Sequence, residues 1–174
     1  PHAKGVFDLD STQLAEIARG MNEGHDMMGR PLAGGTGFYV GAAMFPEAEP
    51  WDVQLARVEQ KIEAGVHFFQ TQAVFDIAKL ERAVEALRPL GAKVIAGVLV
   101  LRSARVIDFV NERLAGLMVP DAIADRIRGA ENPSEAAIVL AAEQVREIRG
   151  IADGVHIMPL GLDSAIGRIL GEAG

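Results

Sequence analysis

The sequence predicts an α/β fold in which four parallel strands alternate with helices, as in about half of a (β/α)8 TIM barrel. Short apolar runs of strand type alternate along the chain with segments whose apolar residues recur at helical spacing. Such alternation is typical of a parallel sheet covered by helices. The first three strand–helix units are almost equally spaced, which favours a barrel of repeated units over a doubly wound sheet. A complete barrel has about 250 residues, whereas this chain has 174.

The expected elements follow one another in a regular order. A first helix is expected at 14–21, with Asp10 as N-cap and Gln13 completing a capping box. Strands are expected at 38–45, 68–75, 93–101 and 154–160. Helices are expected at 51–62, 77–87 and 106–114, then within 119–130, within 132–150 and at 166–170. In the helix within 132–150, Asn132 is the expected N-cap, Pro133 the first helical residue and Glu135 the partner in a second capping box.

Composition and charge exclude several classes of partner and site. The net charge of -7 argues against nucleic acid, because binding a phosphate backbone needs a clustered cationic surface. No apolar stretch approaches the roughly 18 residues of a membrane span, so a cytoplasmic protein without a membrane partner is expected. The chain has no cysteine, which excludes disulfides and thiolate chemistry, and its four histidines show no metal-ligand spacing. No metal site is therefore expected.

Two glutamines in the second strand are the first candidates for a functional site. Strand side chains alternate between faces, so Gln70 and Gln72 share one face with Phe68 and Val74. Gln72 lies near the carboxyl end of the strand, which is the end at which the active sites of barrel enzymes lie. An amide carries a donor and an acceptor, which suits the edge of a heterocycle. The alternative is a pair of core amides that neighbouring barrel side chains satisfy.

Cationic residues supply two further candidates. Gln54, Arg57 and Lys61 form a polar stripe on the helix after the first strand, and its two cations could hold a phosphate-bearing cofactor. A solvated helix face has the same pattern. Arg102 follows the third strand and is placed for ligand contact, although a helix start with Ser103 as cap explains this pair equally well.

Several segments carry a resemblance to a known family. They are FDLDSTQLAEIARGMNEGHDMMGRPL, FYVGAAMFPEAEP, KIEAGVHFFQTQAVFD, AGVLVL with RS, VPDAIADRI and GVHIMPLG. In this order they resemble the C-terminal half of methylenetetrahydrofolate reductase, and most closely its short bacterial form in acetogens. The resemblance covers essentially all 174 residues. It implies that residues 1–174 are the C-terminal half of a single TIM-barrel domain whose N-terminal half is absent here.

The resemblance also implies an activity. In that family, an oxidoreductase passes hydride through a flavin to 5,10-methylenetetrahydrofolate and yields 5-methyltetrahydrofolate, in one-carbon metabolism and methionine biosynthesis. FAD is the implied cofactor, with FMN as a possible substitute. NAD(P)H or a reduced partner, such as an iron–sulfur subunit, is the implied electron donor. A homo- or hetero-oligomer is expected.

The resemblance assigns roles to residues around the substrate. Gln72 matches the family glutamine that hydrogen-bonds the folate pterin and, in the other half-reaction, the nicotinamide donor. Gln70 has no assigned role and is expected to support it, and Arg102 is expected near the substrate. Leu162 stands where better-known members place a substrate arginine. The family's general-acid glutamate and its aspartate near the flavin belong to the N-terminal half, so no catalytic residue is expected here.

The implied cofactor contacts lie after the first strand. Lys61 matches a flavin-contacting lysine, and Phe45 stands where other members often carry a tyrosine against the flavin. Gln54, Arg57 and Gln60 occupy neighbouring contact positions, although Gln54 and Arg57 are not the residues of the best-known members. The segment FPEAEPW is also shorter than theirs and lacks their histidine.

Two other kinds of protein fit the same residues. The chain could be an inactive half-barrel fragment or an assembly module. It could also belong to a barrel that binds pterin for methyl transfer, which would need no flavin.

Overall fold

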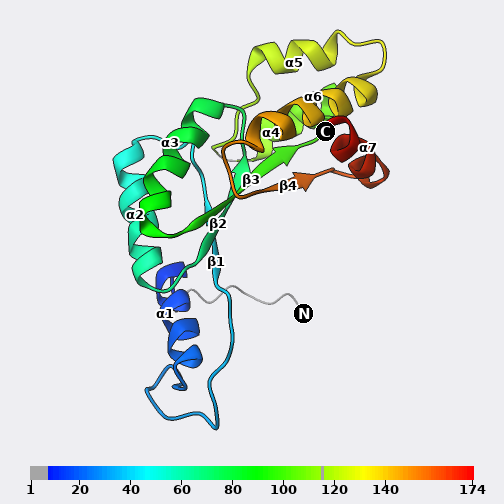
Figure 1. The fold of residues 1–174 in the computed structure, drawn as a ribbon. Coiled ribbons are helices and arrows are strands. Elements are labelled where there is room, and N and C mark those ends of the chain that lie inside the picture. Colours follow the sequence, from blue (N-terminus) through cyan, green and yellow to red (C-terminus); the bar gives the residue numbers. More distant parts are fainter. Residues whose placement is uncertain (1–7, 115) are drawn as a thin grey trace, which may run out of the picture.

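The sheet contains four parallel strands whose spatial order is their order in the chain. The computed structural model describes residues 8–114 and 116–174, and its strands β1 (Gly41–Met44), β2 (Phe68–Ala73), β3 (Lys93–Leu99) and β4 (Gly154–Met158) pair in the order β1-β2-β3-β4 (Figure 1). A doubly wound sheet reverses its strand order at a switch point, and this sheet does not. The predicted α/β class is confirmed, and the topology is that of part of a TIM barrel.

Helices connect the strands and cover one face of the sheet. Helix α1 (Ser11–Asn22) precedes β1, while α2 (Trp51–Glu63) and α3 (Ile77–Leu87) follow β1 and β2. Between β3 and β4 lie α4 (Ala104–Arg113), α5 (Asp121–Arg128) and α6 (Pro133–Ile148), and α7 (Ile166–Glu172) follows β4. Short 3-10 helices occupy Arg88–Leu90 and Asp163–Ala165. Among the described residues, no helix has the length and apolar character that crossing a membrane requires.

The helix starts follow the predicted capping signals with one exception. The Asp10 carboxylate accepts a hydrogen bond from the backbone N–H of Gln13 at 2.8 Å, and the Gln13 side chain accepts one from the backbone of Asp10 at 2.9 Å. Asn132 caps α6 by accepting from the backbone N–H of Glu135 at 3.2 Å. The second predicted capping box is wrong, because the Glu135 carboxylate pairs instead with Arg168 of α7 at 2.6 Å.

The first strand is shorter and less buried than predicted. The hydrogen-bonded ladder between β1 and β2 begins at Gly41. Backbone groups of Phe38 and Val40 form hydrogen bonds with side chains instead. Phe38 exchanges two backbone hydrogen bonds with the side chain of Asn22, at 2.8 and 2.9 Å, and the backbone N–H of Val40 donates to Nδ1 of His67 at 3.1 Å. Phe38 is 49% exposed. The other three strands each end two residues before the predicted position.

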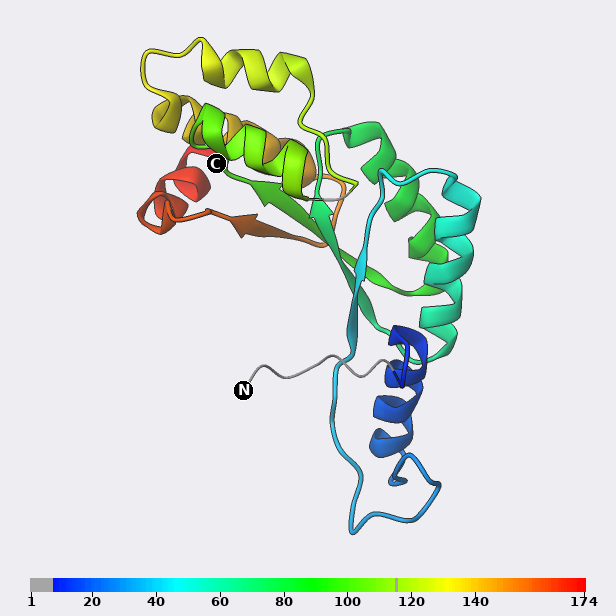
Figure 2. The ribbon, with the colours of Figure 1, turned by 180° about the vertical axis from the view of Figure 1, so that it is seen from behind.

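The two faces of the sheet differ in burial, as the alternation predicts. The side chains of Phe69 and Thr71 in β2 point to the helices and are buried, whereas Gln70 and Gln72 lie on the other face and are exposed. Figure 2 shows the helices gathered around the outside of the twisted sheet. Val74 departs from the predicted pattern: it is 1% exposed, because β2 has already ended at Ala73 and the alternation no longer applies.

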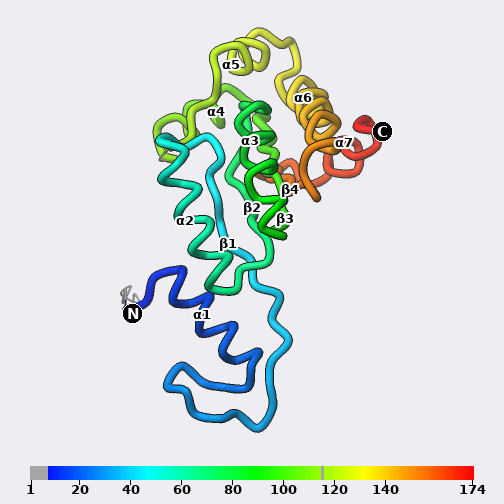
Figure 3. Tube along the Cα trace, turned by 60° about the vertical axis from the view of Figure 1, so that its left-hand side comes forward, coloured from blue at the N-terminus to red at the C-terminus, as the bar shows by residue number. Residues whose placement is uncertain are grey.

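Helix α1 and the segment 23–40 extend beyond the sheet on the side of β1 (Figure 3). Contact between α1 and α2 anchors this extension. Arg19 of α1 donates to the carbonyl of Glu63 at 3.2 Å. The segment then returns to the sheet and enters β1, so that β1 forms one edge of the sheet and β4 forms the other.

Candidate functional site

A hollow on the open face of the sheet holds both predicted glutamines. Its volume is about 390 Å³, and its lining comes from β1, β2 and β4: Gly41, Ala42, Ala43, Phe68, Gln70, Thr71, Gln72 and Met158. Gln72 is the last residue but one of β2, so it lies near the carboxyl end of the strand as predicted. This is the end of a parallel barrel sheet at which ligands bind.

Neither glutamine amide has a hydrogen-bond partner among the described residues. Gln70 and Gln72 are both exposed, and within residues 8–114 and 116–174 no side chain or backbone group hydrogen-bonds to either amide. The alternative of core amides that neighbouring barrel side chains satisfy stays open, because these four strands do not close a barrel. Two donor–acceptor groups on one face, about 7 Å apart along an extended strand, can read the edge of a heterocycle that displays both hydrogen-bond types.

A bulge in β2 lies directly at Gln72. Gln70 pairs with Ile95 but Ala73 pairs with Gly97, so β2 carries one extra residue over this step. The buried Thr71 hydroxyl donates to the carbonyl of Gln72 at 2.6 Å and accepts from the backbone N–H of Gly97 at 2.9 Å. The alternation of side chains along β2 did not predict this bulge. The sequence signal that could have indicated it is the glycine inside the neighbouring strand.

On the α2 flank, one predicted cofactor residue reaches the sheet. The ammonium of Lys61 is 3.5 Å from the carbonyl oxygen of Ala43 in β1. Lys61 is also the one charged residue in the lining of a groove of about 670 Å³ between α1 and the residues 38–43. Gln54 is half-buried, whereas Arg57 and Gln60 are exposed. The structure therefore separates Lys61, which faces β1, from Arg57 and Gln60, which lie toward solvent.

The remaining predicted residues lie at the carboxyl ends of the strands. Phe45 follows β1 and is half-buried, with its ring against Gly116 in the loop after α4. Arg102 follows β3, and its Nε donates to the carbonyl of Leu160, beyond β4, at 2.9 Å. Ser103 caps α4, as the alternative interpretation of the Arg102–Ser103 pair predicted. Arg102 thus ties two loops together while its side chain stays exposed.

Glu47 anchors the loops beside the candidate site, and sequence reasoning missed it. Its carboxylate oxygen Oε1 accepts hydrogen bonds from the backbone N–H groups of Phe75 at 2.5 Å and Asp76 at 2.9 Å. Its carbonyl accepts from the Lys79 ammonium at 3.4 Å. Glu47 lies after β1 and its partners lie after β2, so the carboxylate joins the ends of these strands. No spacing within the sequence signals a contact across 28 positions.

The loop after β1 is held by a second set of contacts. The guanidinium of Arg82 lies 4.6 Å from the ring centre of Trp51 and pairs with the Glu49 carboxylate at 3.2 Å. The hydrogen bond from Arg82 holds the pKa of the Glu49 carboxyl below its ordinary value. These contacts join the start of α2 to α3 and fix the loop that begins with Phe45.

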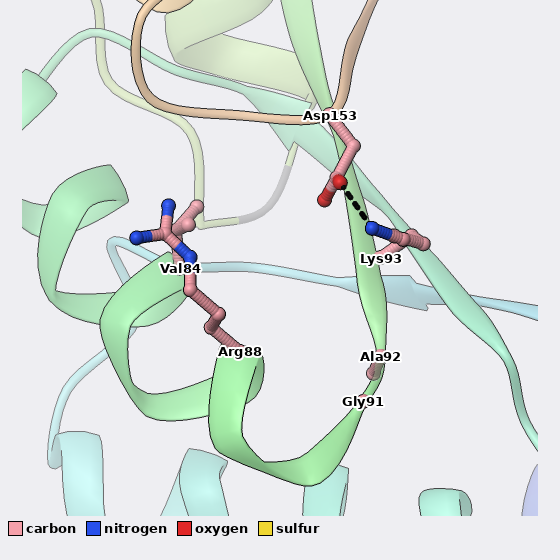
Figure 4. Close-up of a pocket in the computed structure, with 6 residues that line it drawn as sticks. All are labelled: Val84, Arg88, Gly91, Ala92, Lys93 and Asp153. Atoms are coloured by element: carbon pink, nitrogen blue, oxygen red, sulfur yellow. Dashed lines mark hydrogen bonds and ion pairs between the residues drawn. The ribbon is translucent and has the colours of Figure 1, made fainter.

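A separate cavity of about 180 Å³ lies at the opposite ends of the strands (Figure 4). It is bordered by Arg88, by the start of β3 and by the turn before β4. Lys93 pairs there with Asp153 at 2.9 Å, and the Asp153 carboxylate also accepts from the backbone N–H of Val94. The hydrogen bond with Asp153 raises the pKa of Lys93. These groups satisfy one another and stabilise the turn, far from the end that carries Gln72.

Comparison with known proteins identifies the family of the chain. A search of curated proteins gives no significant match. The family model described as methylenetetrahydrofolate reductase matches residues 17–174. That match includes all four strands, both glutamines and every candidate cofactor residue of α2. The chain belongs to the methylenetetrahydrofolate reductase family.

Proposed function

We propose that the chain contributes the folate-binding half of a flavin-dependent reductase that converts 5,10-methylenetetrahydrofolate to 5-methyltetrahydrofolate. The observation that carries the proposal is the Gln72 amide, which lies exposed and unpaired at the carboxyl end of β2 within the described residues. The match to the family supports the same activity. A pterin ring displays donors and acceptors along one edge, and an amide complements such an edge.

Residues of this chain fit a phosphate-bearing flavin on the other side of β1. Lys61 places one cation in an otherwise uncharged groove, and within the described residues no carboxylate pairs with it. A phosphate would provide that charge partner. When bound, a flavin supplies hydride transfer. The chain's own part is to hold the cofactor through Lys61 and to orient the substrate through Gln72. FAD is the cofactor we propose, with FMN as the alternative.

The proposed activity needs more strands than these. Four strands do not close a barrel, and a closed barrel is what excludes water from its interior and surrounds a substrate at its mouth. The family's general acid also belongs to the other half of the barrel. We therefore propose that catalysis occurs in a barrel completed by a further four strands, with NAD(P)H or a reduced iron–sulfur partner as electron donor.

The test uses the protein with its barrel complete. We expect flavin absorbance in the purified protein and reduction of 5,10-methylenetetrahydrofolate. Gln72→Ala is expected to weaken folate binding by about 1–3 kcal/mol, because a buried substrate group loses its partner, while the flavin content stays that of the parent. Gln70→Ala is the matched control on the same face and is expected to have a smaller effect. Parental folate affinity and turnover in Gln72→Ala would contradict the proposal.

A further inference from the structure

We propose that Thr71 is a positioning residue for Gln72, through the hydroxyl that holds the bulge of β2. The inference rests on the proposed function, since it assigns Gln72 to the substrate. Thr71 lies on the buried side of β2 and is 4% exposed, and we assign it no contact of its own with the substrate. It acts on the site through the backbone of Gln72.

The bulge creates the need for such a residue. In a regular parallel ladder, two residues of β2 would match the two-residue step from Ile95 to Gly97 in β3. Here the step from Gln70 to Ala73 takes three residues. At this step the Thr71 hydroxyl contacts both the backbone N–H of Gly97 and the carbonyl of Gln72, in a buried part of the sheet.

The Thr71 hydroxyl bridges both backbone groups at once. It is an acceptor for the backbone N–H of Gly97, at 2.9 Å, and a donor to the carbonyl of Gln72, at 2.6 Å. A hydroxyl is the smallest side-chain group with both capacities. Valine has the same shape as threonine and neither capacity, so it would remove both of these buried hydrogen bonds.

Gly97 shows that the two strands come unusually close at this point. A Cβ at position 97 would lie 2.6 Å from the carbonyl oxygen of Gln72. A residue with a side chain is therefore excluded unless the bulge moves. The close approach and the hydroxyl bridge fix the peptide after Gln72 from two sides, which limits the directions that its amide can take.

Loss of the hydroxyl has a specific geometric consequence. Without the hydroxyl, the bridge between the backbone N–H of Gly97 and the carbonyl of Gln72 is lost. The peptide after Gln72 is then held less firmly at the bulge. A shift larger than the roughly 0.5 Å range of distances that a hydrogen bond tolerates would move the Gln72 amide out of reach of its partner.

The experiment compares Thr71→Val with Thr71→Ser in the complete protein. In the valine variant we expect the folate KM to rise by about tenfold, the equivalent of one substrate hydrogen bond, with the flavin content of the parent. We also expect faster hydrogen exchange at the backbone N–H of Gly97. The serine variant keeps the hydroxyl and is expected to restore both the parental KM and the parental exchange.

Two results would overturn the proposal. One is a folded Thr71→Val variant in which the backbone N–H of Gly97 exchanges at the parental rate. The other is a folded Thr71→Ser variant whose folate KM is raised. If the valine variant does not fold, the folate KM of the serine variant alone tests the proposal. The exchange measurement needs no substrate. A failure of the proposed function, seen as no folate reduction by the parent protein, is therefore distinguishable from a failure of the positioning role.

Discussion

The carboxylate of Glu47 accepts a hydrogen bond from the backbone N–H of Phe75 at 2.5 Å. The same oxygen accepts from Asp76 at 2.9 Å. Because Glu47 follows β1 and Phe75 lies two residues beyond the end of β2, the contact joins the carboxyl ends of two neighbouring strands. One of these strands carries Gln72. A single carboxylate thus fixes the loops around the open end of the candidate site.

Replacement of Glu47 is expected to destabilise the fold at this end. Glu47→Ala should lower the free energy of unfolding by about 1–3 kcal/mol, because two partly buried N–H groups lose their acceptor. Glu47→Gln retains an acceptor oxygen and should lose less. Urea unfolding of the complete protein measures both. Glu49→Ala is the control on the same loop and should lose less, because the Glu49 carboxylate is exposed in its contacts with Arg82, Lys79 and the backbone N–H of Trp51. Equal losses in Glu47→Ala and Glu49→Ala would contradict the anchoring role.

Removal of the Lys61 cation is expected to weaken flavin binding. Lys61→Ala should lower flavin occupancy, and more so at high salt, because the remaining attraction to phosphate is screened when the Debye length falls to about 3 Å at 1 M. Absorbance of the purified protein after gel filtration at low and high salt measures this. Arg149→Ala removes one positive charge from an exposed position at the end of α6 and serves as the control. Equal flavin retention in Lys61→Ala and the parent at both salt levels would assign Lys61 to a solvated helix face.

The ion pair between Arg126 and Glu143 gives the fold a defined acid sensitivity. Hydrogen bonds from Arg126 hold the pKa of the Glu143 carboxyl below its ordinary value of 4.5. A carboxyl whose pKa is lowered in the folded state stabilises the fold above its unfolded pKa, and this contribution is lost as the pH falls through the folded pKa.

Glu143→Gln should therefore destabilise the protein at neutral pH by a few tenths of a kcal/mol, up to about 1, as for other exposed pairs. The difference from the parent should disappear at acid pH, below the lowered pKa that the carboxyl has in the folded state. Urea unfolding of parent and variant across that pH range measures it. A difference that does not change with pH would show that the ion pair is not its cause.

The order of the elements could be predicted from sequence because it depends on local patterns. Strand alternation, helical spacing and the capping residue Asp10 all act within a few positions. The start of β1 could not be predicted, because Phe38 and Val40 bond to Asn22 and His67, whose positions depend on the tertiary fold. The capping box at Glu135 failed for the same reason, since Arg168 from a distant helix competes for its carboxylate.

The candidate site could be predicted only in part. Strand alternation correctly placed Gln70 and Gln72 together on one face, and the fold class placed Gln72 near the carboxyl end. The bulge at Thr71 depends on the register between β2 and β3, which alternation within one strand does not specify. The Glu47 anchor depends on how close two loops come. Both features depend on contacts between segments that are distant in the sequence, so they are seen only in the three-dimensional structure.

The two unpaired edges of the sheet lead to an expectation about residues 1–174 produced alone. Within the described residues, neither β1 nor β4 has a partner on its outer side, and such edges readily pair with other chains. Phe38 and Tyr39 beside β1 are 49% and 65% exposed, which adds apolar surface that favours association.

We expect this polypeptide to oligomerise or aggregate, retain little flavin and lack reductase activity. Joined to the strands that complete the barrel, it should be soluble, yellow and active. Light scattering, circular dichroism and flavin absorbance measure these properties, and a folded, colourless, monodisperse monomer of residues 1–174 would show that the remaining strands are not structurally required.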